Sequence, residues 1–191
     1  MLPLIPCRWS LLATLLLTMV GVANAAGDIS ILSDFATAEI SINGTLITQN
    51  GDRNAALITQ NGDNNFATID QSGGSGGTGN YAEISQTGSG NQAVTSQKTG
   101  DSNRIRIVQS GSNNIANVTQ DGFRNSIDLL QTGDYNSVIA SQIGDDNTIV
   151  ATQPGGILAE IGNGNSIVSN PVLNLIVGVS IVGNGMSVKV Y

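Results

Sequence analysis

The sequence predicts an all-β protein of the β-solenoid type, in which stacked strand-turn-strand rungs form a cross-β, amyloid-type repeat. Three observations lead to this fold class: a repeat of about eleven residues across residues 43–153, alternation of apolar and variable residues inside each repeat, and glycine-containing turns between repeats. A fixed short period is typical of architectures in which each unit buries its apolar face against its neighbours.

The first element along the chain is a predicted signal peptide, residues 1–25. Arg8 precedes an apolar run over residues 11–22, and Ala23-Asn24-Ala25 follows it. A basic flank, a short apolar core and a small-x-small site are typical of a secretory signal. The run is also shorter than the roughly 20 apolar residues that a membrane-spanning helix needs. We therefore expect export, with cleavage after Ala25.

Composition excludes several classes of function. The chain has seven basic and fourteen acidic residues, a formal net charge of −7 and no histidine, and its one cysteine, Cys7, lies in the predicted signal peptide. Binding to nucleic acid requires a basic face, so no nucleic-acid partner is expected. Without histidine or a retained thiol we also expect no enzyme, no cofactor and no metal site. We interpret the repeated turn carboxylates as solubilising residues: Asp52, Asp63, Asp101, Asp134 and Asp145.

Residues 26–42 form a predicted N-terminal leader segment that lacks the repeat motif. Residues 38–42 (AEISI) alternate like an imperfect strand. The sequence leaves open whether the leader serves secretion, docking or capping of the repeats.

Residues 43–153 form the predicted repeat block of ten strands, each reading Asn-x-apolar-x-apolar-x-Gln before a short turn. The period of two is that of a strand, so every second residue shares a face. In one unit this face carries Asn54, Ala56, Ile58 and Gln60, and we expect it to be buried. The predicted stacking residues are the amides at both ends of each unit: Asn43, Gln49, Asn54, Gln60, Asn65, Gln71, Asn80, Gln86, Asn91, Gln97, Asn103, Gln109, Asn114, Gln120, Asn125, Gln131, Asn136, Gln142, Asn147 and Gln153.

Buried amides need hydrogen-bond partners, and stacking of equivalent strands supplies them. An amide that lacks a partner is costly to bury, whereas Asn and Gln ladders along a cross-β axis pair each amide with its copies. Ten strands give five rungs, about 24 Å tall at roughly 4.8 Å per rung. Stacking also predicts that Glu83, Arg106 and Asp128 form one outward column. An antiparallel meander, which the Asn-Gly turns also suit, stays open.

Residues 154–191 are predicted to be degenerate C-terminal strands. Pro154 and two glycines interrupt the pattern, and residues 165–169 partly restore it. The apolar stretch over residues 172–182 is too short for a membrane span. Its weakly charged strands make the C-terminal segment a candidate for docking between subunits.

The repeat Gln-x-Gly-x-x-Asn-x-Ala-x-x-x-Gln resembles that of the curlin family, the subunits of curli fimbriae, and the resemblance is close over residues 43–153. It implies a structural subunit of an extracellular functional amyloid, secreted to a cell-surface fimbrium in the biofilm matrix, with a role in surface adhesion. It implies self-association, association with other curli-type subunits, and passage through an outer-membrane secretion channel. By the same resemblance, the amides would drive polymerisation.

The leader and four arginines favour the minor, nucleator-type subunit. The leader is not glycine-rich as in the major subunit, and Arg53, Arg104, Arg106 and Arg124 interrupt the neutral pattern expected of a fast-polymerising chain. The alternative function is a monomeric β-solenoid that binds a surface, as an adhesin or ice-binding protein does. Threonines are too irregularly placed for a regular ice-binding face, whereas exposed apolar residues suit adhesion or lateral packing of fibres.

Overall fold

The computed structural model describes residues 18–23, 29–35, 43–73, 79–152, 155–169 and 176–190. In these residues the chain is all strand and turn, with no helix. The strands are β1 (Thr18–Ala23), β2 (Ile29–Phe35), β3 (Gly44–Asn50), β4 (Ala55–Asn61), β5 (Phe66–Ser72), β6 (Tyr81–Ser89), β7 (Gln92–Gln97), β8 (Arg104–Ser112), β9 (Ile115–Asp121), β10 (Ser126–Thr132), β11 (Ser137–Ile143), β12 (Thr148–Thr152), β13 (Gly155–Ile161), β14 (Ser166–Ser169), β15 (Ile176–Val182) and β16 (Ser187–Val190).

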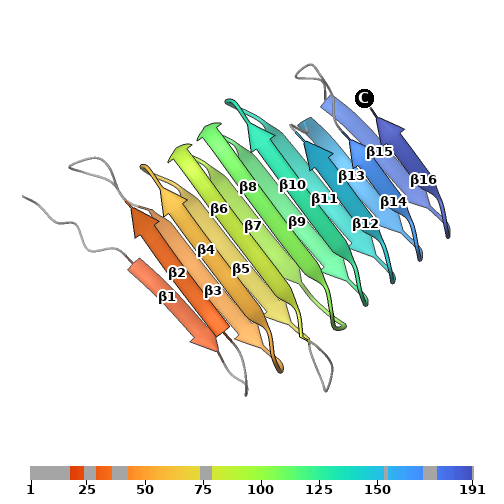
Figure 1. Ribbon diagram of the computed structural model, residues 1–191, viewed down its shortest axis with the longest axis horizontal. Helices are drawn as coiled ribbons and strands as arrows, with labels where there is room; N and C mark the ends of the chain where they lie inside the picture. Colours follow the sequence, from red (N-terminus) through yellow and green to blue (C-terminus); the bar gives the residue numbers. More distant parts are fainter. Residues whose placement is uncertain are drawn as a thin grey trace, which may run out of the picture.

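Alternate strands belong to two facing parallel sheets. The odd sheet has the order β1-β3-β5-β7-β9-β11-β13-β15, and the even sheet runs from β2 to β16 in the same sense. The strands lie side by side across the long axis, so the chain advances steadily from one end of the coil to the other (Figure 1). The predicted β-solenoid is confirmed. The antiparallel meander is wrong, because every pairing between described strands is parallel and joins equivalent repeat positions, as Ala82 with Ile105.

The core lies between the two sheets and is filled by the two apolar residues of each repeat. The first is alanine in half of the repeats, and the second is in most repeats a larger aliphatic residue, as in Ala82 and Ile84 of β6. Both side chains are fully buried, and the residues between them are more exposed. The sheets therefore pack through narrow, nearly identical layers, and this repetition brings equivalent polar residues above one another.

Glycine in the turns is required by the close approach of successive rungs. Gly122 has φ +123°, and a Cβ on it would lie 2.1 Å from the carbonyl oxygen of Gly144 in the next turn. A side chain there would collide with backbone, and the left-handed φ also disfavours L residues. The residue just before the asparagine, such as Arg124, has φ near +56° as well. The glycine thus sets the spacing at which the turns stack.

Strands also occur on both sides of the repeat block. β1 lies inside the predicted signal peptide and pairs with β3, while β2 lies inside the leader and pairs with β4. The imperfect strand predicted at residues 38–42 lies outside the described residues. Beyond the block, β13 to β16 continue both sheets in register. The repeat coil is therefore longer than the ten motif-bearing strands.

Candidate functional site: the buried amide columns

The glutamines of the repeats form two continuous columns, one inside each sheet. The described glutamines of the motif are at most 1% exposed. In the odd sheet Gln49 donates from Nε2 to Oε1 of Gln71 at 2.9 Å, and the chain of bonds continues through Gln97 and Gln120 to Gln142. In the even sheet the column runs from Gln60 through Gln86 and Gln109 to Gln131 at 2.7–2.8 Å. These lengths are those of good hydrogen bonds.

Each glutamine also joins the two sheets. The second N–H of Gln109 donates to the backbone carbonyl of Gln92 at 3.0 Å, and that of Gln86 donates to the carbonyl of Phe66 at 3.0 Å. The acceptor in both cases begins the preceding strand, which lies in the opposite sheet. The glutamine amide therefore holds successive rungs together and also closes one edge of each rung.

The asparagines are arranged differently from the ladder that the sequence predicted. Asn103 accepts at Oδ1 from the backbone N–H of Asn125 at 3.0 Å, and its Nδ2 donates to the carbonyl of Gly122 at 2.7 Å. Only some neighbouring asparagines also bond side chain to side chain, as Asn114 does with Asn91. The asparagine therefore ties the start of its strand to the backbone of the next turn.

The structure thus places the predicted stacking residues from Asn43 to Asn147 in buried columns along one axis. Gln153 lies outside the described residues. That these amides join one subunit to another stays a prediction. The glycine after each glutamine was not singled out as part of the site, although its carbonyl receives the asparagine N–H.

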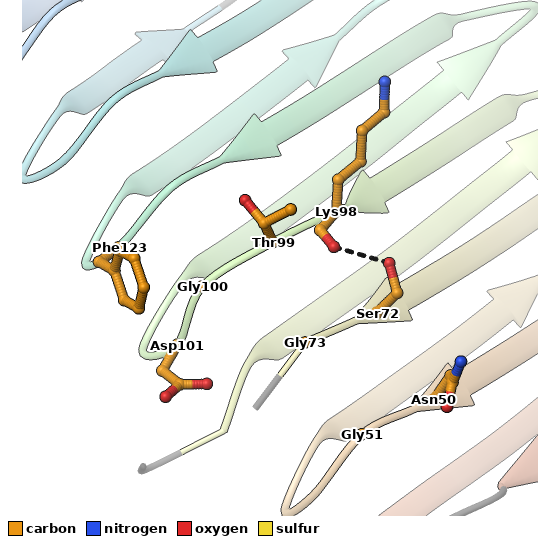
Figure 2. Close-up of a pocket in the computed structure, with 9 residues that line it drawn as sticks. All are labelled: Asn50, Gly51, Ser72, Gly73, Lys98, Thr99, Gly100, Asp101 and Phe123. Atoms are coloured by element: carbon orange, nitrogen blue, oxygen red, sulfur yellow. Dashed lines mark hydrogen bonds between the residues drawn. The ribbon is translucent and has the colours of Figure 1, made fainter. Parts of the chain in front are cut away.

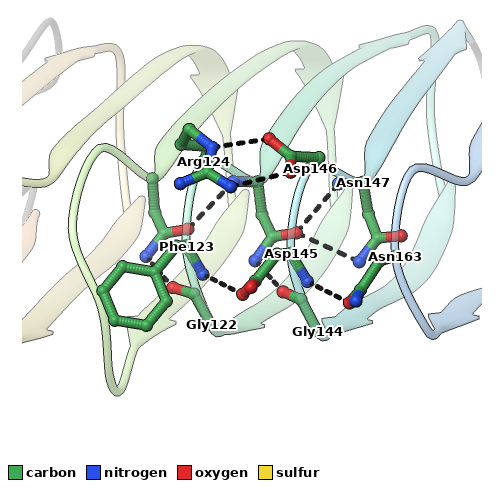
Figure 3. A network of polar contacts seen from close by, with 10 residues as sticks. Gly122, Phe123, Arg124, Gly144, Asp145, Asp146, Asn147 and Asn163 are labelled. Atoms are coloured by element: carbon green, nitrogen blue, oxygen red, sulfur yellow. Dashed lines mark hydrogen bonds and ion pairs between the residues drawn. The ribbon is translucent and has the colours of Figure 1, made fainter.

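The turns carry a third ladder, made by short polar side chains that follow the glycine. Asp145 accepts at Oδ1 from the backbone N–H of Phe123 at 2.9 Å and donates its own N–H to Oδ1 of Asn163 at 2.8 Å. Figure 3 shows these bonds linking successive turns beside the asparagine column. Asp134 accepts in the same way from Ser112 N–H at 2.7 Å. The interpretation of these two carboxylates as merely solubilising was incomplete, because they also connect rungs.

An ion pair lies outside this turn ladder. Arg124 donates to Asp146 through Nε at 2.6 Å and through Nη2 at 2.8 Å (Figure 3). This hydrogen bond lowers the pKa of Asp146 below its ordinary value and raises that of Arg124. Both groups are exposed, so the pair is screened by water and salt.

The predicted charge column is confirmed on the outer face of the even sheet. Glu83, Arg106 and Asp128 are in register on β6, β8 and β10. Arg106 is 3.9 Å from the Glu83 carboxylate and 3.2 Å from that of Asp128. Next to it, the Arg104 guanidinium lies 5.2 Å from the centre of the Tyr81 ring, within cation–π range. Partial burial and Glu83 raise the pKa of Tyr81. The charged residues therefore alternate in sign from rung to rung.

One hollow interrupts the regular surface near the glycine-serine insertion. It has a volume of about 380 Å³ and is lined by residues that include Lys98, Asp101 and Phe123 (Figure 2). Ser72 donates to the carbonyl of Lys98 at 2.8 Å across it. Its polar groups do not converge on a common point as they would around a bound ligand.

In the described part of the chain we find neither a group of three potential metal ligands nor a helix long and apolar enough to cross a membrane.

A comparison with known protein families identifies the repeat that forms these columns. The model of the curlin associated repeat matches residues 43–73, 77–111 and 124–155, which together make up just over half of the chain. A search of curated proteins and a search of solved structures gave no match. The matched segments contain the motif whose amides form the columns. The chain therefore belongs to the family of proteins that carry the curlin associated repeat.

Proposed function

We propose that this chain is a structural subunit of extracellular curli-type amyloid fibres, of the minor type that nucleates the major subunit. The observation that carries the proposal is the amide columns, which pair every internal rung with the next through identical bonds. Stacked rungs leave unpaired backbone groups and amide positions at the ends of the coil, so a strand of another subunit can add to either end. Its family implies self-association into curli fibres outside the cell.

The nucleating role is supported by contacts that fix one chain in register before it meets another. Arg106 contacts carboxylates on both neighbouring strands, and Arg124 binds Asp146 in the adjacent turn. All of these contacts lie within the chain. The charges alternate in sign from rung to rung. A strand displaced along the axis by one rung would therefore face a neighbour of like charge, which is unfavourable. A coil held in register in this way is suited to template a partner.

Export and adhesion complete the proposal. The predicted signal peptide and the family resemblance support secretion through an outer-membrane channel to the cell surface, where the fibre contributes to the biofilm matrix. Exposed apolar side chains on the outer faces, such as Phe66 and Ile139, support contact between fibres or with a surface.

Thioflavin T fluorescence and fibre diffraction test the function. We expect the chain beginning at Ala26 to form fibres with reflections near 4.8 and 10 Å in near-neutral buffer. We also expect it to shorten the lag of a purified curli major subunit at substoichiometric concentration. A chain that remains a soluble monomer alone and leaves the major subunit's lag unchanged would refute the proposal and favour a monomeric surface-binding solenoid.

A further inference from the structure

The two glutamine columns have a direction. In every bond between neighbouring glutamines of the described columns, Nε2 of the earlier residue donates and Oε1 of the later residue accepts, as from Gln86 to Gln109 at 2.8 Å. A column built in this way presents an acceptor at its N-terminal end and requires a further acceptor at its C-terminal end. The two ends of the coil therefore differ chemically.

The N-terminal end of the even-sheet column has an unsatisfied acceptor. Gln60 is fully buried, yet its Oε1 has no hydrogen-bond partner. The strand that covers it, β2, places Asp34 at the register position of Gln60. Aspartate has no side-chain N–H, so β2 pairs with β4 through the backbone without supplying the amide donor that would continue the column. A buried acceptor that is left unpaired makes this covering strand a weak one.

Among the described residues past Gln142 and Asn165, no amide continues the odd-sheet glutamine column or the even-sheet asparagine column. In the odd sheet Glu160 occupies the register position after Gln142, and Ile181 occupies the next. Ile181 is almost completely buried. In the even sheet Met186 follows Asn165 and donates its backbone N–H to Asn165 Oδ1 at 3.1 Å, but its side chain has no N–H to pass on. The final described rung thus presents aliphatic and thioether side chains where internal rungs present N–H donors.

We infer that the N-terminal edge of the repeat coil, formed by β3 and β4, is a docking surface for the last rung of another curlin-repeat chain, one whose inward residues there are glutamine and asparagine. Such a strand donates its side-chain N–H to Gln60 Oε1 and takes the place of β2. A second copy of this chain fits less well, because its last described rung has no such donor. The inference rests on the proposed function and adds direction and partner choice to it.

Cleavage of the predicted signal peptide uncovers the odd-sheet part of this edge. It removes β1, which pairs with β3, and leaves β2 as the remaining cover over β4. Backbone pairing still allows copies of this chain to join end to end. The inference therefore predicts slow assembly of the chain alone and fast assembly onto a partner with amides in its last rung.

The first test restores the missing amides in the chain beginning at Ala26. Glu160→Gln, Ile181→Gln and Met186→Asn are combined, and seeded elongation is followed by thioflavin T. We expect elongation about tenfold faster than for the wild type, since the last rung then offers amides to β3 in the odd sheet and to β4 in the even sheet, and tenfold corresponds to about 1.4 kcal/mol at each junction. The acceptor of Gln60 itself is examined by the second test. The matched control combines Glu160→Gln with Ile181→Met and Met186→Leu, which remove the charge without adding donors at the last rung, and it should elongate like the wild type.

The second test acts on the opposite end and does not depend on the folding of the first variant. Asp34→Asn supplies a side-chain N–H at the register position of Gln60, so β2 should cover β4 more tightly. We expect about tenfold slower hydrogen exchange of the β2 backbone amides and a similar slowing of elongation. Asp34→Ala removes the carboxylate without adding a donor and should show neither effect.

The outcomes separate this inference from the proposed function. Equal elongation of the wild type, the amide-restored chain and its control, with no slowing by Asp34→Asn, would overturn the directional docking surface. Cross-β fibres formed by all of them would leave the proposed function intact. Absence of fibres from the wild type, both alone and with a curli major subunit, would refute the proposed function itself.

Discussion

Replacing Gln109 by methionine tests the glutamine column at the centre of the even sheet. Methionine is nearly the same length as glutamine but carries no N–H or C=O. In the folded chain Gln109 accepts from Gln86 at 2.8 Å and donates to Gln131 at 2.7 Å and to the carbonyl of Gln92 at 3.0 Å. The variant therefore keeps the volume of the core and removes three hydrogen bonds.

The magnitude follows from the groups left without partners. Gln131 Oε1 loses its donor, and one N–H of Gln86 loses its acceptor while the other keeps Phe66. A buried group left unpaired costs about 1–3 kcal/mol, so the free energy of unfolding should fall by about 2–6 kcal/mol. The carbonyl of Gln92 retains a second lone pair for other partners and adds less.

The same substitution at Gln60 is the matched comparison, because Gln60 ends the column. Gln60→Met leaves Gln86 Oε1 without its donor at 2.7 Å but also removes the unsatisfied Oε1 of Gln60. The two changes oppose each other, and the long bond from Gln60 Nε2 to the Gly44 carbonyl at 3.3 Å adds little because that carbonyl keeps a second lone pair, so we expect a loss of only about 0–1 kcal/mol. Val108→Ala, on the outer face of the same strand as Gln109, controls for general perturbation of β8.

Denaturant unfolding followed by circular dichroism measures all three variants, at concentrations low enough that the midpoint does not depend on concentration. Similar losses for Gln60→Met and Gln109→Met would refute the reasoning, because position in the column would then be irrelevant. A Gln109→Met variant as stable as Val108→Ala would show that the amide bonds contribute nothing net.

Three further outcomes are expected. Gly122→Ala should destabilise the coil by about 1–3 kcal/mol or more through its clash with the next turn, whereas Gly185→Ala, with open space around its Cβ position, should cost less when both are compared by denaturant midpoint. Arg106→Gln should lower stability by about 0.2–1 kcal/mol for each carboxylate contact, and the difference should shrink in 1 M salt; a loss unaffected by salt would argue against an ionic origin. The pKa of Asp146 should lie below its ordinary value in an NMR titration, because its arginine partner favours the ionised form. A lowered folded-state pKa means that its contribution is present above the ordinary pKa and is lost as the pH falls through the folded-state value, and Asp146→Asn should abolish this acid-side dependence.

Most of the fold could be predicted from the repeat pattern, because each strand makes the same contacts. Period-two alternation predicted which face of a strand such as β6 is buried, and the eleven-residue spacing predicted that Glu83, Arg106 and Asp128 share a column. Both depend only on register, which repetition fixes once one face must be buried. The buried amides favoured parallel stacking over a meander, and the parallel pairing of the strands then excluded the meander.

The details of the turns could not be predicted in the same way. An asparagine at the start of a strand is compatible with a side-chain ladder and also with bonding to the next turn's backbone. The choice depends on how closely successive turns approach one another. That distance follows from the positions of the glycine carbonyls in the structure and cannot be read from the repeat pattern. The strand β2 was missed because Ile29–Phe35 has no terminal amides, and only its pairing with β4 places Asp34 at the ladder position of Gln60.

Solid-state NMR of fibres tests the central claim most directly, that side-chain amides bond along the axis inside the coil. With ¹⁵N-labelled and ¹³C-labelled glutamine side chains, we predict magnetisation transfer from Gln86 Nε2 to the side-chain carbonyl carbon of Gln109, and slow exchange of that N–H with deuterated solvent. Glutamine side-chain N–H groups that exchange within minutes and show no transfer between these two residues would contradict the account.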